Sequence, residues 1–319
     1  MAMTATQEVY VDESSVGESA WRQVWGRLRR KKLAMISLLI VVAIYLGGIF
    51  APLIAPYGYN TQDLDRGLEG PSADHWLGTD RLGRDMLSRT LYSARTTVVV
   101  TTAVVLSGSL FIGTTLGLIA GYRGGWVDNL IMRVGDIFAG LPAIIMLILI
   151  NASLGRRVED AARWVEDHTF LDGLVSSGFH SYLLVFGALS LFFWVGSARV
   201  IRAQVLQLRE NDFILAAESL GGSSARVIRS HILPNVSFLI VLGISASLGG
   251  IAGSEILLTW FGVGVQNAPS FGGMIYEGSG ARTFQSHPHL LLVPGAVVTA
   301  LLFAFNLFGD ALNDAMRGR

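Results

Sequence analysis

The chain has 319 residues, of which 51% are hydrophobic and 15% are charged, and its formal net charge is zero. This composition excludes an ordinary soluble globule, and a neutral chain has no general attraction for nucleic acid. Cysteine is absent, which also excludes disulfides, thiolate metal sites and cysteine nucleophiles.

Long uncharged runs dominate the sequence. A helix needs about 20 apolar residues to span a bilayer. Six runs are long enough, and they lie between Lys32 and Asp63, Arg95 and Arg123, Asp136 and Arg156, Asp172 and Arg199, His231 and Glu255, and His289 and Asp310. We therefore predict an all-α polytopic membrane protein with six transmembrane helices, the first at 33–56.

The N-terminal segment 1–32 is predicted to be a cytoplasmic tail. With this end inside, the inner segments hold fifteen Lys and Arg residues and the outer segments nine, so the positive-inside rule favours cytoplasmic N and C termini. Trp21, Trp25 and Leu28 recur at helical spacing among basic residues. They predict an amphipathic helix on the inner lipid surface, with a plain orienting signal as the alternative.

Two features mark the second and third runs. Gly113, Gly117 and Gly121 are four residues apart and predict a face where another helix packs closely. After the third run, the segment 156–180 is charged. Its apolar residues fit a helical stripe, at Val158, Ala161, Ala162 and Val165. We expect a small soluble helix on the outer face, and we hypothesise that it adapts the outer mouth to a binding protein.

The segment 212–235, DFILAAESLGGSSARVIRSHILPN, is a polar interruption between the fourth and fifth runs. Asp212 can cap a short helix, and Gly221 can end it in the left-handed conformation. The apolar stripe of this helix is Phe213, Ala216, Ala217 and Leu220. A serine of the turn can cap a second helix, which Pro234 should stop just before the fifth run. The second helix carries two arginines, Arg226 and Arg229.

This helix, glycine elbow and helix is tied at both ends to membrane spans, so a force on it would move them. The alternative from physics alone is an amphipathic loop that rests on the lipid headgroups. A nucleic-acid-binding helix-turn-helix is disfavoured, because two arginines beside a bilayer neutralise little phosphate.

The same segment resembles the EAA loop of bacterial ABC-transporter permeases. The matching residues are Asp212, Ala216, Ala217, Gly221, Leu233, Pro234 and Asn235. Leu215 stands where that family has a glutamate. The resemblance implies that this loop couples the spans to an ATPase through Asp212, Leu215, Ala216, Ala217, Gly221, Arg226, Arg229 and Pro234.

Further stretches resemble the C-type, or second, subunit of the dipeptide, oligopeptide and nickel permease branch. They are HWLGTDRLGRDMLSRTLYSART at 75–96, RVGDIFAGLP at 133–142, SEILLTWFGVGVQNAPSFGGMI at 254–275 and FNLFGDALNDAMRGR at 305–319. Ser93 stands where glycine is usual, and 156–180 resembles an insertion. The resemblance implies an outer loop at 57–96 and a permease domain at 97–319.

What the resemblance implies is a type I ABC importer permease fold in the prokaryotic plasma membrane, and uptake of di- or oligopeptides. The chain contains no G-x-x-x-x-G-K-[ST] motif for ATP, so we expect a transport subunit that is not itself an enzyme and needs no cofactor. The implied partners are a second permease subunit in a heterodimer, two ATP-binding subunits and an extracytoplasmic solute-binding protein. An ion-gradient-coupled carrier and a membrane scaffold remain as alternatives.

Three other residues are candidates for chemistry. Glu255 is an acid in an apolar run, near the predicted outer end of its span. It predicts support of a neighbouring helix or loop, with substrate contact as the alternative. His287 and His289 have no carboxylate neighbour in sequence, so we predict loop residues and no metal site.

Overall fold

The computed structural model describes residues 20–265 and 268–316, and their regular structure is helical. The helices are α1 (Ala20–Arg30), α2 (Lys32–Ile49), α3 (Ala51–Ile54), η2 (Leu64–Arg66), α4 (Met86–Val104), η3 (Val105–Gly113), α5 (Thr114–Arg123), α6 (Gly125–Gly140), α7 (Ala143–His168), α8 (Phe179–Leu208), α9 (Asp212–Ser219), α10 (Ser224–Val227), η4 (Ile228–Ile232), α11 (Leu233–Trp260), α12 (Phe271–Gly278), α13 (Ala281–Ser286) and α14 (His289–Met316). The segments η3 and η4 are π-helical, and η2 is a short 3₁₀ turn.

Five helices in this part of the chain are long and apolar enough to cross a bilayer. They cover Lys32–Ile49, Met86–Arg123, Phe179–Leu208, Ser224–Trp260 and His289–Met316. The bent pair α6 and α7 supplies the sixth candidate. The prediction of an all-α, polytopic chain is confirmed. The helix that starts at Met86 takes in the end of the segment 57–96, which was expected to be outer loop.

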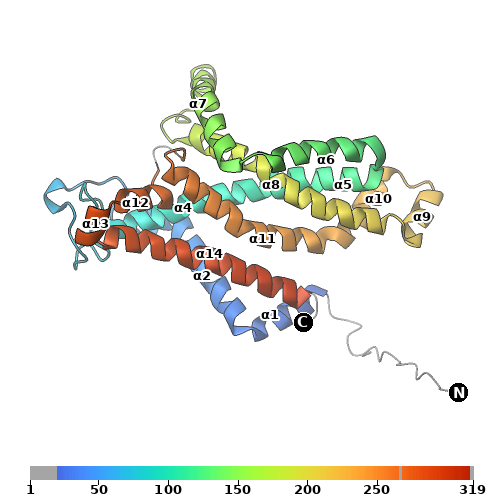
Figure 1. The fold of residues 1–319 in the computed structure, drawn as a ribbon, viewed down its shortest axis with the longest axis horizontal. Coiled ribbons are helices and arrows are strands. Elements are labelled where there is room, and N and C mark those ends of the chain that lie inside the picture. The colour runs from blue at the N-terminus through green and yellow to red at the C-terminus, as the bar shows by residue number, and fades with distance from the viewer. Residues whose placement is uncertain (1–19, 266–267, 317–319) are drawn as a thin grey trace.

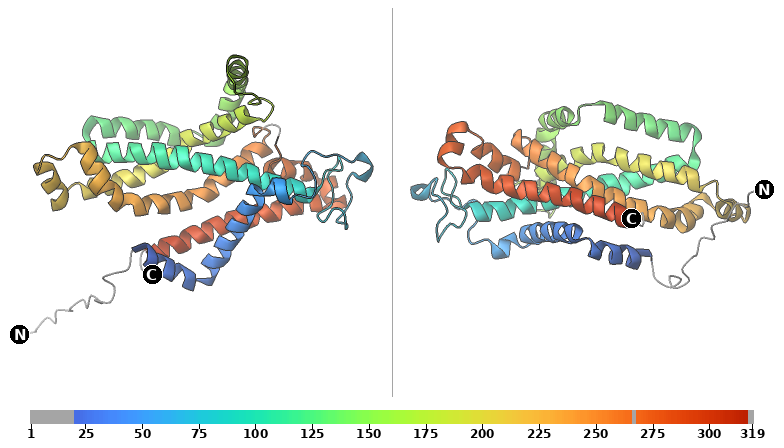
Figure 2. Two further views of the ribbon diagram at one scale, coloured as in Figure 1. Left: turned by 180° about the vertical axis from the view of Figure 1, so that it is seen from behind. Right: turned by 60° about the horizontal axis from the view of Figure 1, so that its bottom comes forward.

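The third predicted span is broken. The axes of α6 and α7 differ by 91° at a break formed by Leu141 and Pro142. Proline disfavours helical backbone at the residue before it, and Leu141 is extended at φ −90° and ψ 142°. Figures 1 and 2 show α7 turned away from the long axis of the bundle.

A separate helix was predicted within the segment 156–180, and this prediction is wrong. The helix α7 is continuous over 26 residues, so the stripe at Val158 to Val165 forms its second half. No glycine or proline interrupts the chain between Pro142 and His168 except Gly155, and a single glycine is tolerated inside a long helix.

The helix α8 lies at the centre and packs against α4, α5, α6, α7 and α11. Its contact with the second span is close because glycines face it. A Cβ at Gly117 would lie 2.8 Å from the Ala198 carbonyl oxygen, and one at Gly113 would lie 2.8 Å from the Trp194 carbonyl oxygen. The predicted glycine packing face is confirmed.

The helix α1 packs against the end of α14. Val24 and Leu28 are buried there with Leu312 and Ala315. Leu28 therefore faces protein, and the prediction that it faces lipid is wrong, because the covering helix lies far away in sequence. Trp25 is 40% exposed, while the side chain of Trp21 and the tail at 1–19 lie outside the described residues.

The bundle has two distinct ends. The elbow at α9 and α10 lies at one end, and the start of α1 and the end of α14 lie toward that end (Figure 1). The loop that holds η2, together with α12 and α13, lies at the other end. The common location of α1 and the last turn of α14 fits termini on one side of the membrane.

Candidate functional site

The elbow between α9 and α10 is built on Gly221, as predicted. Gly221 has φ +80°, a backbone conformation that side chains other than glycine rarely adopt. Its N–H donates to the Glu218 carbonyl at 2.9 Å, and the Gly222 N–H donates to the Ala217 carbonyl at 3.0 Å. These two bonds form a Schellman motif, which ends α9 and turns the chain sharply.

The residue that precedes α9 is Asn211, and its side chain makes no capping bond. The prediction that Asp212 caps this helix is wrong, because Asp212 is already in its first turn. A carboxylate there still interacts favourably with the helix dipole. Ser223 caps the second helix as predicted, since its Oγ accepts the Arg226 N–H at 3.4 Å.

Pro234 was predicted to stop the second helix, and this prediction is wrong. The helix runs without a break from Ser224 to Trp260 through the π-helical turn η4. A π-helical turn is one of the irregularities that let a helix continue past a missing N–H. The elbow is therefore continuous with the membrane-spanning helix α11.

One fully buried residue anchors α9 to the bundle, and three large apolar side chains in α9 or directly after it are exposed. Ile214 is fully buried, in a cluster that includes Val227 and Val236. The exposed apolar side chains are Phe213 at 44%, Leu215 at 49% and Leu220 at 89%. The stripe expected from helical spacing thus largely faces outward, and a partner would have to bury it.

Two contacts between distant segments hold the elbow and the end of α8 to the second span. The Tyr122 hydroxyl donates a 2.6 Å hydrogen bond to the Glu218 carboxylate, and Arg209 donates to the Gly121 carbonyl at 3.4 Å. Sequence reasoning missed both, because the partners are 96 and 88 residues apart. Arg226 and Arg229 are exposed and make no ion pair with any described residue.

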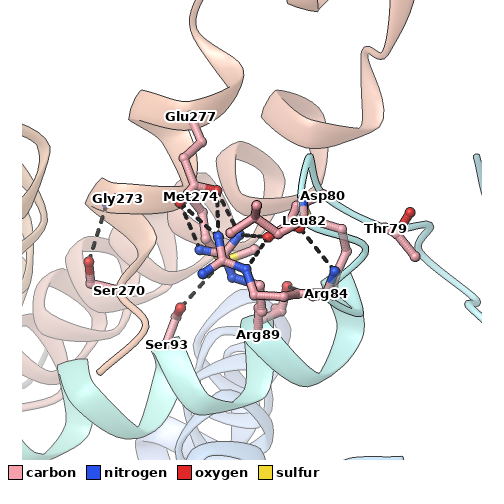
Figure 3. Close-up of polar contacts among 12 residues, drawn as sticks. Thr79, Asp80, Leu82, Arg84, Arg89, Ser93, Ser270, Gly273, Met274 and Glu277 are labelled. Carbon is pink, nitrogen blue, oxygen red and sulfur yellow. Dashed lines mark hydrogen bonds and ion pairs between the residues drawn. The ribbon is translucent and has the colours of Figure 1, made fainter. Parts of the chain in front are cut away.

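At the opposite end, four charged residues form a cluster that sequence reasoning also missed (Figure 3). Asp80 accepts bonds from Arg84 and Arg89, each at 2.5 Å. Arg89 also pairs with Glu277 of α12 at 2.6 Å. Asp80 and Arg89 are 1% and 5% exposed, so their ion pair is a buried clamp between α4 and the loop before it, and the half-exposed Glu277 extends this clamp to α12. The GRD motif at 83–85 was the available signal.

Asp85 of the same motif starts α4. Its carboxylate accepts the Ser88 N–H at 2.7 Å, which is an N-cap, and lies 2.9 Å from His75 Nδ1. Gly83 has φ +69°, and a Cβ there would lie 1.6 Å from the Asp63 carbonyl oxygen. Gly83 therefore lets the chain pass close to Asp63, and Asp85 caps α4, so both residues of the motif have a structural role.

The sequence matches two family models. Residues 113–319 match the model described as "Binding-protein-dependent transport system inner membrane component". Residues 19–71 match "N-terminal TM domain of oligopeptide transport permease C". The chain belongs to the family of binding-protein-dependent inner-membrane permeases. ATP hydrolysis in this family is carried out by separate subunits, so the permease is not itself an ATPase.

Named relatives cover nearly all of this permease. It is 36% identical over 300 residues to the dipeptide transport system permease protein of Alkalihalophilus pseudofirmus, covering 93% of this chain and 90% of the relative. It is 34% identical to the oligopeptide transport system permease protein of Bacillus subtilis, with 93% and 89% covered. It is 33% identical to the glutathione transport system permease protein of Pectobacterium atrosepticum, with 99% and 96% covered.

Glu255 of the permease is fully buried in α11. Its Oε2 accepts a 2.9 Å hydrogen bond from the Thr97 hydroxyl of α4. This contact joins α11 to α4, and the supporting role of Glu255 stays a prediction. His289 lies 3.2 Å from the Thr79 carbonyl oxygen, and the described residues contain no group of three potential metal ligands around His287 or elsewhere.

Proposed function

We propose that this permease subunit serves an ATP-driven importer of short peptides and forms half of its translocation path. The support for the cargo is the chemistry shared by the named relatives, whose names specify dipeptides, oligopeptides and glutathione, itself a tripeptide. The complete transporter would contain a second permease subunit as heterodimer partner, two ATP-binding subunits and an extracytoplasmic solute-binding protein.

The observation that carries the proposal is the elbow. Ile214 of α9 is fully buried in the bundle. Phe213, Leu215 and Leu220, in α9 or directly after it, are exposed. Burying a Phe or Leu side chain contributes about 1.5–3 kcal/mol, so a cleft that covers these three would bind α9 well. We propose that this cleft belongs to an ATP-binding subunit, with the residues 212–235 as the coupling surface.

The proposed coupling follows from two connections. On one side the elbow is continuous with α11 through η4, and on the other α9 follows α8 after a short turn. A movement of α9 with the ATPase would therefore displace both helices together. In this scheme Asp212, Ala216, Ala217 and Gly221 shape the inserted helix. Arg226, Arg229 and Pro234 lie on the second helix of the elbow.

Uptake into proteoliposomes tests the energy source. The complete transporter is reconstituted with the binding protein outside and ATP enclosed, and uptake of labelled trialanine is measured. We expect uptake only with hydrolysable ATP. Uptake that persists under a proton or sodium gradient without ATP would favour a carrier instead, and a complex that transports no peptide under either condition would favour a scaffold.

A further inference from the structure

A cavity of about 340 Å³ lies between η3, α8 and α11, in the membrane-spanning part of the permease. Its volume falls in the range of about 300–1,000 Å³ that is typical of small-molecule sites. The walls are open because of two glycines. A Cβ added to Gly196 or to Gly243 would meet no atom within 4 Å.

One wall of the cavity contains a buried hydroxyl without a partner. Ser109 is 1% exposed and lines the cavity, and its Oγ makes no hydrogen bond with any described residue. Ser107, in the same π-helical segment, is satisfied by the Ala103 carbonyl at 2.6 Å and the Ser190 hydroxyl at 2.7 Å. A buried hydroxyl without a hydrogen bond is unfavourable, and π-helical turns occur frequently at functional sites.

The chemistry of the walls selects the kind of ligand. The residues that line the cavity include the hydroxyls of Ser109, Ser197 and Ser247, and none of them is charged. A charged group would be costly to bury there, so the amides of a peptide would lie inside this cavity and its charged ends outside it. A hydroxyl can both donate and accept, so it matches the N–H and C=O groups of a neutral amide. Phe192 and Phe193 add apolar contact area.

A second cavity, of about 310 Å³, continues from the first. Val200, Leu239, Gly243 and Ala246 line both. The second cavity reaches Asn306, Asp310 and Asn313, which follow one another along α14 toward its end at Met316. Polar side chains in a membrane helix usually face protein or water rather than lipid. The two cavities therefore make a trough that leads toward the end of the bundle where the elbow lies.

We propose that the cavity at Ser109 is a transient binding site for the backbone amides of a peptide in transit, and that the trough is its exit. The inference rests on the proposed function, since it names a site on the path of that cargo. Recognition of the backbone rather than the side chains would allow peptides of different sequence to pass.

Thiol labelling tests whether a peptide occupies the cavity. The chain has no cysteine, so Gly243→Cys supplies a single thiol at the junction of the two cavities. Gly187→Cys is the matched control, because Gly187 lies on α8 with open space around it and does not line the cavity. The complete transporter is treated with a water-soluble methanethiosulfonate, with and without the trialanine-loaded binding protein, and labelling of this chain is measured by mass.

We expect Gly243→Cys to lose most of its labelling when loaded binding protein is present, and Gly187→Cys to be unchanged. Equal labelling with and without peptide would overturn the proposal. Labelling only by a lipid-soluble maleimide would indicate an acyl chain in the cavity. Labelling by the methanethiosulfonate in the isolated chain but not in the complete transporter, with or without peptide, would indicate a helix of the second permease subunit. Both results would also overturn it.

A steric test separates this inference from the proposed function. Gly243→Leu fills the cavity, and uptake of trialanine should fall by about ten-fold or more while the membrane level of the complex is unchanged. Gly187→Leu should retain uptake. If the parent transporter shows no ATP-driven uptake of any short peptide, the proposed function fails. If the parent transports and Gly243→Leu transports equally well, only the site fails.

Discussion

Tyr122 and Glu218 join the end of the second span to the elbow, through a 2.6 Å hydrogen bond from the phenol to the carboxylate. Because α9 also follows α8 and α10 leads into α11, this bond makes the elbow a junction of three spans. The exposed apolar face of α9 is therefore connected to three membrane spans.

Tyr122→Phe should loosen this junction without unfolding the permease. A hydrogen bond to a charged group is worth about 1.5–3 kcal/mol, and less at an exposed position such as this one. We expect fewer peptides transported per ATP hydrolysed, with an unchanged level of the complex in the membrane. Tyr276→Phe, at an exposed tyrosine of α12, is the control. An unaltered transport-to-ATP ratio would show that the bond plays no part in coupling.

Gly221→Ala should weaken assembly with the ATP-binding subunit. Gly221 has open space around it, so the cost comes only from its φ of +80°, and amounts to about 1–2 kcal/mol for an alanine. Gly221→Asn should be milder, because asparagine tolerates this conformation. Retention of the ATP-binding subunits after solubilisation measures the effect. Gly187→Ala is the control, and equal retention in all variants would contradict the prediction.

Asp80→Asn should destabilise the outer end of the permease. It would leave Arg84 and Arg89 with one acid, Glu277, and breaking a buried pair costs about 3–5 kcal/mol. We expect a lower Tm in detergent. Glu159→Gln, which removes an exposed pair with Arg163, should change stability by less than about 1 kcal/mol. Equal Tm values for both variants would refute the buried clamp.

Glu69 lies in the loop between α3 and α4, outside the candidate spans. The hydrogen-bonded Arg66 guanidinium holds the pKa of the Glu69 carboxyl below its ordinary value. A lowered folded-state pKa stabilises the fold above the unfolded value of about 4.3, and this contribution is lost as the pH falls through the folded-state pKa. Glu69→Gln should therefore flatten the acid side of the stability profile, measured as Tm between neutral and acidic pH. An identical profile would count against the pair.

Sequence reasoning succeeded where one local constraint decides the structure. The uncharged runs predicted the spans because lipid excludes charge, and Gly221 predicted the elbow because its backbone conformation favours glycine. The glycines at Gly113 and Gly117 likewise predicted close packing.

It failed where distant segments meet or where the direction of a helix matters. Arg89 and Glu277 are 188 residues apart, so their pairing leaves no local pattern. An apolar run has the same composition whether its helix is straight or bent, which is why the break at Pro142 was not anticipated. At Pro234 a local rule was correct for an α-helix but did not allow for the π-helical turn η4.

In the proposed transporter, the exposed face of α9 sits in a cleft of an ATP-binding subunit. Leu220→Cys places the only thiol of this chain at the most exposed large apolar side chain of the elbow, and Leu64→Cys places it at the opposite end of the bundle. Each variant is labelled in the complete transporter with a benzophenone maleimide and then irradiated. We predict a covalent adduct with the ATP-binding subunit from Leu220→Cys and none from Leu64→Cys. Efficient labelling of Leu220→Cys without any adduct to an ATP-hydrolysing subunit would contradict the account.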